Sequence, residues 1–390
     1  MLTKIKYLFL LVVKLTKKIK IFICCTEQSG ENISYNLCKK IRKYNYQIDG
    51  VGGNLSKNYF TNKYYDISIF KSLGLLEILF SIPKYLKIIN NLTKEILKND
   101  YDLVICIDSP DFNYQLAKKL KKKGFKKSII QIVAPTVWAW RKGRAKKFAK
   151  YYDEIFTLFS FEKNYFEIEG LKTTFIGHPI SLIKSINYYN NQEKNLIAFL
   201  PGSRENEINK LFPYFEYIYN YLLKSNQNRF SIFIPTLPHL INKITNLTKN
   251  WKIKTIVSDN IIQNEKLYEK VFASVTCSGT ASLEISKRLI PQIVLYKLNK
   301  LTYFIFSFLI KIRFANIINI INNKMIIEEV VNRSLNKRNL IISFNKLIND
   351  QKFRDTQIFN IKKNLEKFDS SSDPYEICEQ RIREIISKAT

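Results

Sequence analysis

Short apolar segments alternate with helical segments along almost the whole chain, and this alternation limits the fold more than any other feature. The clearest example is DLVICID, in which the five residues Leu103–Ile107 carry no charge. Such a run predicts a strand covered on both faces, and repeated strand–helix units predict an α/β fold with parallel sheets. Ligands bind at the carboxyl ends of strands in such sheets. Asp108, which ends this run, is therefore placed where chemistry is done.

Two series of strands are predicted, with a polar, asparagine-rich stretch at 181–194 between them. The first series comprises Lys20–Cys25, Gln47–Val51, Asp102–Asp108, Ser128–Ala134, Glu154–Phe159 and Thr173–Ile176. The second lies in NLIAFLPGSR, RFSIFIPT, KIKTIVSD, VFASVTCSGT and PQIVLYK. Because 390 residues exceed a usual single core, we predict two Rossmann-like domains with a cleft between them.

The predicted domain boundaries follow from these segments. They are an N-terminal extension at 1–19, a first Rossmann-like domain at 20–180, a linker at 181–194, a second Rossmann-like domain at 195–370 and a C-terminal helix at 371–390. No sequence repeat of short period is present, so a solenoid is not expected.

The net charge of +30, with seven lysines between Lys118 and Lys127, admits two interpretations. One is attraction to nucleic acid, an anionic membrane or another phosphate-bearing partner, which salt would weaken. The other is a solvated surface produced by A+T-rich codons, because Lys, Asn, Ile, Tyr and Phe are abundant while Gly, Pro and Met are scarce. The charge alone therefore identifies no partner.

Cysteine and histidine usage bears on metals and redox chemistry. The six cysteines include no CxxC pair, and the chain has only two histidines, His178 and His239. We expect the cysteines to be small buried residues in a reducing compartment, and a histidine-built metal site is disfavoured. We therefore predict no metal and no cofactor, so that any divalent ion would be carboxylate-bound or arrive with substrate.

Three apolar segments raise the question of a membrane. The run Tyr7–Val13 is too short to span a bilayer and lacks a signal cleavage site, so it is either a plain extension or a basic surface anchor. Residues 73–92 carry apolar side chains at helical spacing, and Pro83 is expected to kink or split that helix. Leu301–Ile312 is also too short to span. The latter two segments either pack in a core or face lipid.

Loops of the first half carry candidate chemistry at predicted strand ends. TEQSGE follows the first strand and opens a helix whose N–H groups suit an anion or a sugar, and Glu27 or Glu31 either binds a ligand or caps the helix. IDSPDFN presents Asp108 and Asp111, and APTVWAWR follows the next strand. His178 in FIGHP is a base, a phosphate contact or a loop anchor.

Two loops of the second half suit phosphate groups. LPGSRENEI places Arg204 at a helix start after a tight turn, although an exposed arginine in an ordinary turn would have the same sequence. CSGTASLE presents Ser278, Gly279 and Thr280 at another strand-to-helix turn, where phosphates approach the amide groups. Together they predict a nucleotide-diphosphate site in the second half, facing an acceptor site in the first.

With these loops in this order, the chain resembles the lipid A disaccharide synthases, bacterial glycosyltransferases of GT-B fold. The resemblance runs through TEQSGE, VGG, GLLEIL, IDSPDFN, PTVWAWR, FEKNYF, FIGHP, LPGSRENEI, SGTASLE and EEVVN. Only the first twenty residues and the linker fall outside it. The fold it implies is α/β, GT-B, with two Rossmann-like domains, a cleft between them and a C-terminal helix.

The resemblance implies an inverting transfer in lipid A biosynthesis. UDP-2,3-diacylglucosamine and 2,3-diacylglucosamine 1-phosphate (lipid X) would give a β-1,6-linked disaccharide 1-phosphate and UDP. A carboxylate would take the proton of the acceptor 6-hydroxyl. We assign this role to Asp108, with Asp111, Glu27 and His178 as rivals.

The resemblance also implies a set of binding residues. The UDP-binding residues would be Arg204, Ser278, Gly279, Thr280, Glu284 and Glu329, the last near the ribose. The acceptor- and lipid-binding residues would be Ser29, Trp138, Trp140, Arg141 and His178. Metal independence would follow, since Arg204 and helix dipoles take the charge of the diphosphate. The implied partners are the two lipid substrates and the inner-membrane surface, without nucleic acid, and the implied location is cytoplasmic, peripheral on the inner membrane.

The chain departs from the family pattern in three places. Glu31 stands where aspartate is usual, the Ser-Leu-Pro-Asn before the late glutamate is replaced around Ile317–Asn319, and Asn332 stands where glutamine is usual. Two alternatives to the synthase stay open. One is another UDP-sugar enzyme of GT-B fold, either an epimerase or a lipid-linked peptidoglycan glycosyltransferase. The other is a non-catalytic basic membrane-binding protein.

Overall fold

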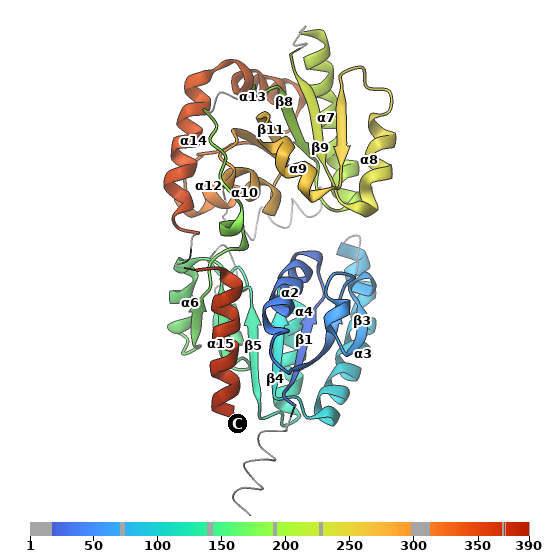
Figure 1. Ribbon diagram of the computed structural model, residues 1–390, viewed down its shortest axis with the longest axis vertical. Helices are drawn as coiled ribbons and strands as arrows, with labels where there is room; N and C mark the ends of the chain where they lie inside the picture. The colour runs from blue at the N-terminus through green and yellow to red at the C-terminus, as the bar shows by residue number, and fades with distance from the viewer. Residues whose placement is uncertain are drawn as a thin grey trace, which may run out of the picture. The chain divides into compact units, whose positions relative to one another are not determined.

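The computed structural model describes residues 18–70, 75–138, 143–189, 193–225, 229–297, 313–368, 370 and 372–389, with the backbone alone at 75–81 and 389. The chain forms two compact units (Figure 1). Unit 1 is Met1–Pro179 with Ser370–Thr390, and unit 2 is Ile180–Asp369. Three predicted features lie outside the described residues. They are most of the N-terminal extension, the apolar segment Leu301–Ile312, and Trp140 and Arg141.

Unit 1 is built on a parallel sheet of seven strands in the order β3-β2-β1-β4-β5-β6-β7. The strands are β1 (Lys20–Cys25), β2 (Gln47–Gly52), β3 (Asn62–Asp66), β4 (Leu103–Ile107), β5 (Ser128–Ile132), β6 (Glu154–Thr157) and β7 (Thr173–Phe175). The strand order reverses between β1 and β4, which is the point where open α/β sheets bind ligands. Asp108 follows β4 directly and therefore lies at this point.

The helices of unit 1 connect these strands. They are α2 (Gln28–Ile41), α3 (Leu75–Asn99), α4 (Pro110–Lys122), α5 (Arg144–Ala149), α6 (Lys163–Glu167) and the terminal α15 (Pro374–Ala389). The α3 helix is continuous through Pro83, so the proline does not split it, and a kink at this position stays a prediction. Further along α3, Ile89, Leu92 and Ile96 are buried in the core of unit 1.

The α15 helix belongs to unit 1, although it follows unit 2 in the sequence (Figure 1). Lys40 of α2 pairs with both Asp373 and Glu376 at 2.8 Å. Arg381 of α15 binds both oxygens of the buried Glu154 in β6, at 2.8 and 2.9 Å. These contacts fix α15 against α2 and against β6.

Unit 2 has a second parallel sheet, with six strands in the order β10-β9-β8-β11-β12-β13. The strands are β8 (Leu196–Leu200), β9 (Ser231–Pro235), β10 (Thr255–Ser258), β11 (Val271–Cys277), β12 (Gln292–Tyr296) and β13 (Glu328–Val331). The helices are α7 (Glu205–Lys224), α8 (Ile241–Thr248), α9 (Ile261–Tyr268), α10 (Thr280–Lys287), α12 (Ile317–Asn322), α13 (Lys337–Asn349) and α14 (Gln351–Leu365). The predicted class of two parallel-sheet α/β units is confirmed.

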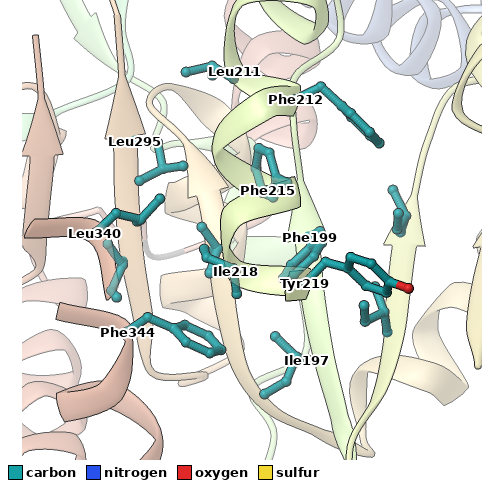
Figure 2. Close-up of a cluster of buried hydrophobic side chains, with 14 of the residues drawn as sticks. Ile197, Phe199, Leu211, Phe212, Phe215, Ile218, Tyr219, Leu295, Leu340 and Phe344 are labelled. Atoms are coloured by element: carbon teal, nitrogen blue, oxygen red, sulfur yellow. The ribbon is translucent and has the colours of Figure 1, made fainter. Parts of the chain in front are cut away.

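The core of unit 2 explains why α7 packs on its sheet. Phe215 and Ile218 of α7 lie against Phe199 of β8, and Phe344 of α13 joins the same cluster (Figure 2). The Phe199 and Phe215 rings are 5.1 Å apart between centroids. Each such side chain, when fully buried, stabilises the fold by about 1.5–3 kcal/mol. This packing fixes the start of α7, and therefore Arg204 at its N-terminus.

Candidate active site

Asp108 lies in a loop whose backbone is unusual for its residues. Asp108 and Ser109 have φ angles of +53° and +44°, and Val133 in the neighbouring loop has +70°. A left-handed conformation at a non-glycine residue costs about 1–3 kcal/mol, and strained residues of this kind concentrate at functional sites. The predicted strands ending at Asp108 and Ala134 stop one and two residues early, at Ile107 and Ile132, because the backbone turns there.

The carboxylate of Asp108 meets the start of α2. The Ser29 hydroxyl donates a hydrogen bond to Asp108 Oδ2. A Cβ atom at Gly30 would lie 3.1 Å from Asp108 Cβ and 3.2 Å from the carbonyl oxygen of Ile107, so this close approach needs glycine. The structure therefore brings TEQSGE and IDSPDFN together, with Ser29 touching the proposed base.

The two glutamates of TEQSGE have different surroundings. Glu27 is exposed at the N-cap position of α2, and its side chain makes no capping bond there. Glu31 is fully buried and accepts from Gly53 N at 2.7 Å and from Ser56 N and Oγ at 2.9 Å. Glu31 therefore anchors the loop after β2, while Glu27 is accessible to a ligand.

Asp111, the second carboxylate of IDSPDFN, is 80% exposed in the first turn of α4 and pairs with Arg144. A pocket of about 450 Å³ adjoins this pair. Its lining residues are Asp111, Tyr114, Gln115, Gly143, Arg144, Lys147 and Phe148. Asp111 is thus held by a cation at a surface pocket, in contrast to Asp108, whose partner is a hydroxyl.

Trp138 of the VWAWR loop is anchored by a buried acid. Its indole Nε1 donates to Glu162 Oε1 at 3.0 Å, and its ring meets Phe161 edge-on at 5.5 Å. Glu162 also accepts from Phe159 N at 3.2 Å. Burial raises the pKa of Glu162 to about 7, against the lowering effect of these donors. FEKNYF thus supplies the anchor for the tryptophan loop.

His178 lies beside the same aromatic group. Its ring stacks on Phe159 at 5.6 Å, and burial lowers its pKa to about 4. The imidazole is therefore neutral at pH 7, and such a low pKa makes it a weak proton acceptor. Its predicted role at the acceptor site stays a prediction.

In unit 2, the loop after β8 turns at Gly202, whose φ is +123°. A Cβ there would lie 2.6 Å from Glu207 Oε2, and Ser203 N donates to the same carboxylate at 3.3 Å. Arg204 is exposed at the N-cap position of α7. The loop therefore presents a guanidinium and backbone N–H groups at a helix N-terminus, an arrangement that suits an anion.

The loop after β11 lies at the same edge, because β8 and β11 are neighbours in the sheet. Gly279 has φ +124°, is exposed, and precedes Thr280 at the N-terminus of α10. Ser278 Oγ donates to the carbonyl oxygen of Ala315 at 2.8 Å. Arg204, Gly279 and Thr280 are thus exposed on adjacent loops, as the prediction of a diphosphate site requires.

Glu284 and Glu329 are more enclosed than the other predicted UDP-binding residues. Burial raises the pKa of Glu284, while Arg288 opposes that shift. Glu329 accepts from Ala315 N at 2.7 Å, from Asn316 N at 2.9 Å and from Asn319 Nδ2 at 2.6 Å. Glu329 therefore ties the segment before α12 to β13, and its contact with a ribose stays a prediction.

Sequence reasoning missed one residue of this site, Gln131. It is a fully buried amide in β5, and its Nε2 donates to the carbonyl oxygen of Asp108 at 3.0 Å. The available signal was a lone polar residue within the apolar run SIIQIVA.

The described ranges contain neither a metal-binding cluster nor a helix that could span a membrane. No three His, Cys, Asp or Glu side chains there gather as a metal-binding group. No helix in that part of the chain is long and apolar enough to cross a membrane. All six cysteines lie within the described residues, where they are buried and form no disulfide.

Two parallel-sheet α/β units, with anion-type loops at strand ends of the second, define a protein of the GT-B class, which contains glycosyltransferases and sugar-nucleotide epimerases. A UDP-GlcNAc 2-epimerase from Neisseria meningitidis bound to UDP-GlcNAc aligns with a TM-score of 0.59 at 15% identity, over 95% of this chain and 100% of that one. The glycotransferase of kitacinnamycin aligns with 0.61 at 11% identity, over 95% and 99%.

Sequence comparison gives the family. A model of the lipid-A-disaccharide synthetase family matches residues 21–380. The lipid-A-disaccharide synthase of Acinetobacter baylyi is 32% identical over 372 residues, which are 90% of this chain and 94% of the relative. The chain therefore belongs to the lipid-A-disaccharide synthetase family, and it is a glycosyltransferase of lipid A biosynthesis.

Proposed function

We propose that the protein transfers diacylglucosamine from UDP-2,3-diacylglucosamine to the 6-hydroxyl of 2,3-diacylglucosamine 1-phosphate. The products are the β-1,6-linked disaccharide 1-phosphate and UDP. Family membership supports the reaction. The observation that carries the assignment of residues is the Asp108 carboxylate, held by Ser29 at the reversal point of the sheet in unit 1.

The chemistry needs one proton acceptor and one group to stabilise the leaving diphosphate. The acceptor 6-hydroxyl attacks the anomeric carbon, its proton passes to Asp108, and the bond to the diphosphate breaks with both electrons leaving on UDP. Arg204 and the N–H groups at the starts of α7 and α10 stabilise the charge that grows on the diphosphate. No metal is required, because the guanidinium and these N–H groups supply the positive potential.

The remaining residues divide between two substrates. UDP binding is assigned to Arg204, Ser278, Gly279, Thr280, Glu284 and Glu329 of unit 2. Acceptor and lipid binding is assigned to Ser29, Trp138, Trp140, Arg141 and His178 of unit 1. Asp111 and Glu27 are the alternative proton acceptors, because both are exposed on the two loops that surround Asp108.

The direct test is turnover with pure substrates in detergent. The protein, given UDP-2,3-diacylglucosamine and the monosaccharide 1-phosphate, should release UDP and form the disaccharide 1-phosphate, both measured by mass spectrometry. Absence of product at any protein concentration would contradict the proposal. An epimerase is distinguished in the same assay, because it would alter the UDP-sugar without needing the acceptor.

We also propose that the protein works in the cytoplasm at the surface of the inner membrane. Both substrates carry acyl chains, and the net charge is +30. In α3, Ile82 and Leu86 are 44% and 51% exposed, which gives unit 1 apolar side chains at its surface. The protein should cosediment with vesicles containing anionic lipid and detach as salt is raised. Binding that is equal with neutral vesicles would contradict the electrostatic part.

A further inference from the structure

We infer that Gln131 and Asn113 are positioning residues that hold the Asp108 carboxylate toward its substrate, an inference that rests on the proposed role of Asp108 as proton acceptor. Neither side chain reaches a substrate surface, since both are fully buried. Both act on the backbone of the Asp108 loop.

Gln131 occupies a position where the sheet would otherwise be apolar. It pairs with Cys106 in the parallel register, and Cys106 pairs with Cys24, so the three residues form a row across β5, β4 and β1. Its Nε2 donates to the carbonyl oxygens of Asp108, Ile132 and Val133 at 3.0, 3.1 and 3.1 Å. One amide therefore ties together the ends of two neighbouring strands.

Asn113, one turn into α4, forms hydrogen bonds to the same loop from the other side. Its Nδ2 donates to the carbonyl oxygen of Asp108 at 2.8 Å and to that of Ile107 at 3.3 Å. The Asp108 carbonyl thus accepts from two buried amides and faces the protein interior. Asp108 N also donates to the carbonyl oxygen of Ile132 at 2.9 Å.

These contacts explain how non-glycine residues keep a left-handed backbone. With its carbonyl drawn inward, Asp108 adopts φ +53° and directs its carboxylate to Ser29 at the start of α2. Val133, where a β-branched side chain disfavours φ +70°, has its carbonyl held by the same Gln131 amide. Such a backbone persists only where the surroundings determine it fully.

The arrangement also leaves buried polar atoms unmatched. Asn113 Oδ1, Gln131 Oε1 and Ser109 Oγ are buried without a hydrogen-bond partner among the described residues. Buried polar groups are normally paired, and each unpaired one weakens the fold. A leucine or methionine would avoid this cost in a strand that served stability alone. The retained amides therefore point to the geometry of the loop as their purpose.

The test begins with Gln131→Met, which keeps the length of the side chain and removes its N–H donors. We expect kcat to fall about a hundredfold, since a displacement of about 1 Å at a reacting group has this effect. UDP affinity should stay within about threefold of the wild-type value, because the proposed UDP site lies in unit 2. The matched control is Gln357→Met, which removes another buried glutamine that donates to a backbone carbonyl, Gln292 O at 3.0 Å. It should leave kcat unchanged.

Gln131→Glu tests the hydrogen bond itself, because a mere loss of packing would not make the effect on kcat depend on pH. A protonated carboxyl has one O–H donor and can restore the bond to Asp108, whereas the ionised form would face three carbonyl oxygens. The ratio of variant to wild-type kcat should therefore rise about tenfold as the pH falls from 8 to 6. If Gln131→Met fails to fold, the pH dependence of Gln131→Glu still tests the positioning role of Gln131.

Three results would overturn the inference. They are a wild-type kcat for Gln131→Met, an equal loss of kcat in Gln357→Met, and a variant-to-wild-type ratio for Gln131→Glu that does not change with pH. Failure of the proposed function looks different, because the wild-type protein itself would then form no disaccharide. If the wild type is active and Asp108→Asn is equally active, the base assignment fails, and the positioning role with it.

Discussion

The two candidate sites are built by opposite means. In unit 1, the loop that carries Asp108 holds non-glycine residues in a left-handed backbone and depends on buried amides. In unit 2, the corresponding positions of the two anion-type loops are Gly202 and Gly279, which adopt positive φ without strain. A diphosphate needs only exposed N–H groups and a cation, which glycine turns provide. A proton acceptor needs one carboxylate in one place, and that requires side chains to hold it.

The largest expected effect separates the two sites directly. Asp108→Asn should lower kcat about a thousandfold, or about 4 kcal/mol, because the amide cannot take the proton, while UDP affinity in unit 2 stays unchanged. Steady-state kinetics and UDP titration by calorimetry measure the two quantities. Asp111→Asn is the matched control and should lose less than tenfold. A larger loss of kcat in Asp111→Asn would assign the role of proton acceptor to Asp111, at the surface pocket, instead of Asp108.

The next effect tests how far unit 1 depends on buried polar anchors. Burial raises the pKa of Glu162 from 4.5 to about 7, so the folded state holds a proton that the unfolded state releases. The protonated Glu162 makes its full contribution to the free energy of unfolding below pH 4.5. This contribution of about 3 kcal/mol is lost as the pH rises to about 7. Glu162→Gln does not titrate and should lack this loss.

Denaturant unfolding of both proteins at pH 5 and pH 8 measures the difference. The Glu162→Gln variant should gain stability relative to the wild type as the pH rises. The unfolding transition of unit 2 should be the same in the variant and in the wild type. Parallel pH dependence in the two proteins would show that Glu162 ionises normally in the folded state.

A smaller effect is expected at the cation of unit 2. Arg204→Ala should raise the Kd for UDP about thirtyfold, or about 2 kcal/mol, because it removes a charge-assisted contact with the diphosphate. Arg204→Lys keeps the charge but loses the forked geometry, and should recover part of the affinity. Calorimetry at low and high salt measures both. Equal Kd values for the wild type and both variants would show that Arg204 does not contribute to UDP binding.

The smallest effect tests the glycine turn itself. Gly279→Ala adds a Cβ that meets no atom within 4 Å, so its cost is the backbone strain at φ +124° alone. We expect about 1 kcal/mol, seen as a Kd for UDP about fivefold higher. Gly143→Ala is the control, because Gly143 has equal space but an ordinary helical φ of −64°. If both variants bind UDP as the wild type does, the turn tolerates a side chain and the contrast between the units weakens.

The sequence predicted most of the sheet in unit 1, since its central strands are buried runs with clear apolar patterns. It missed β3, whose residues NKYYD are polar and only half-buried at the edge of the sheet. The sequence also did not predict which unit the terminal helix packs against. An amphipathic pattern shows which face of a helix is buried, but it does not show which surface covers that face. Both failures come from elements whose structure depends on distant neighbours.

At the candidate sites, the sequence placed the loops correctly at strand ends but could not rank the side chains within them. Glu27 and Glu31 look alike in TEQSGE, and only the burial of Glu31 against Gly53 and Ser56 separates anchor from accessible acid. Gln131 gave a weak signal, because one polar residue in an apolar strand has many uses. Its three bonds to the Asp108 and Val133 loops became visible only in three dimensions.

The return of α15 to unit 1 has a consequence for how the protein is made. Synthesis runs from the N-terminus to the C-terminus, so the whole of unit 2 is synthesised before the final sixteen-residue helix. During that interval Glu154, which is only 2% exposed in the finished fold, has Lys172 at 3.6 Å but lacks the two hydrogen bonds that Arg381 donates. Unit 1 is therefore the first to be translated and the last to be completed.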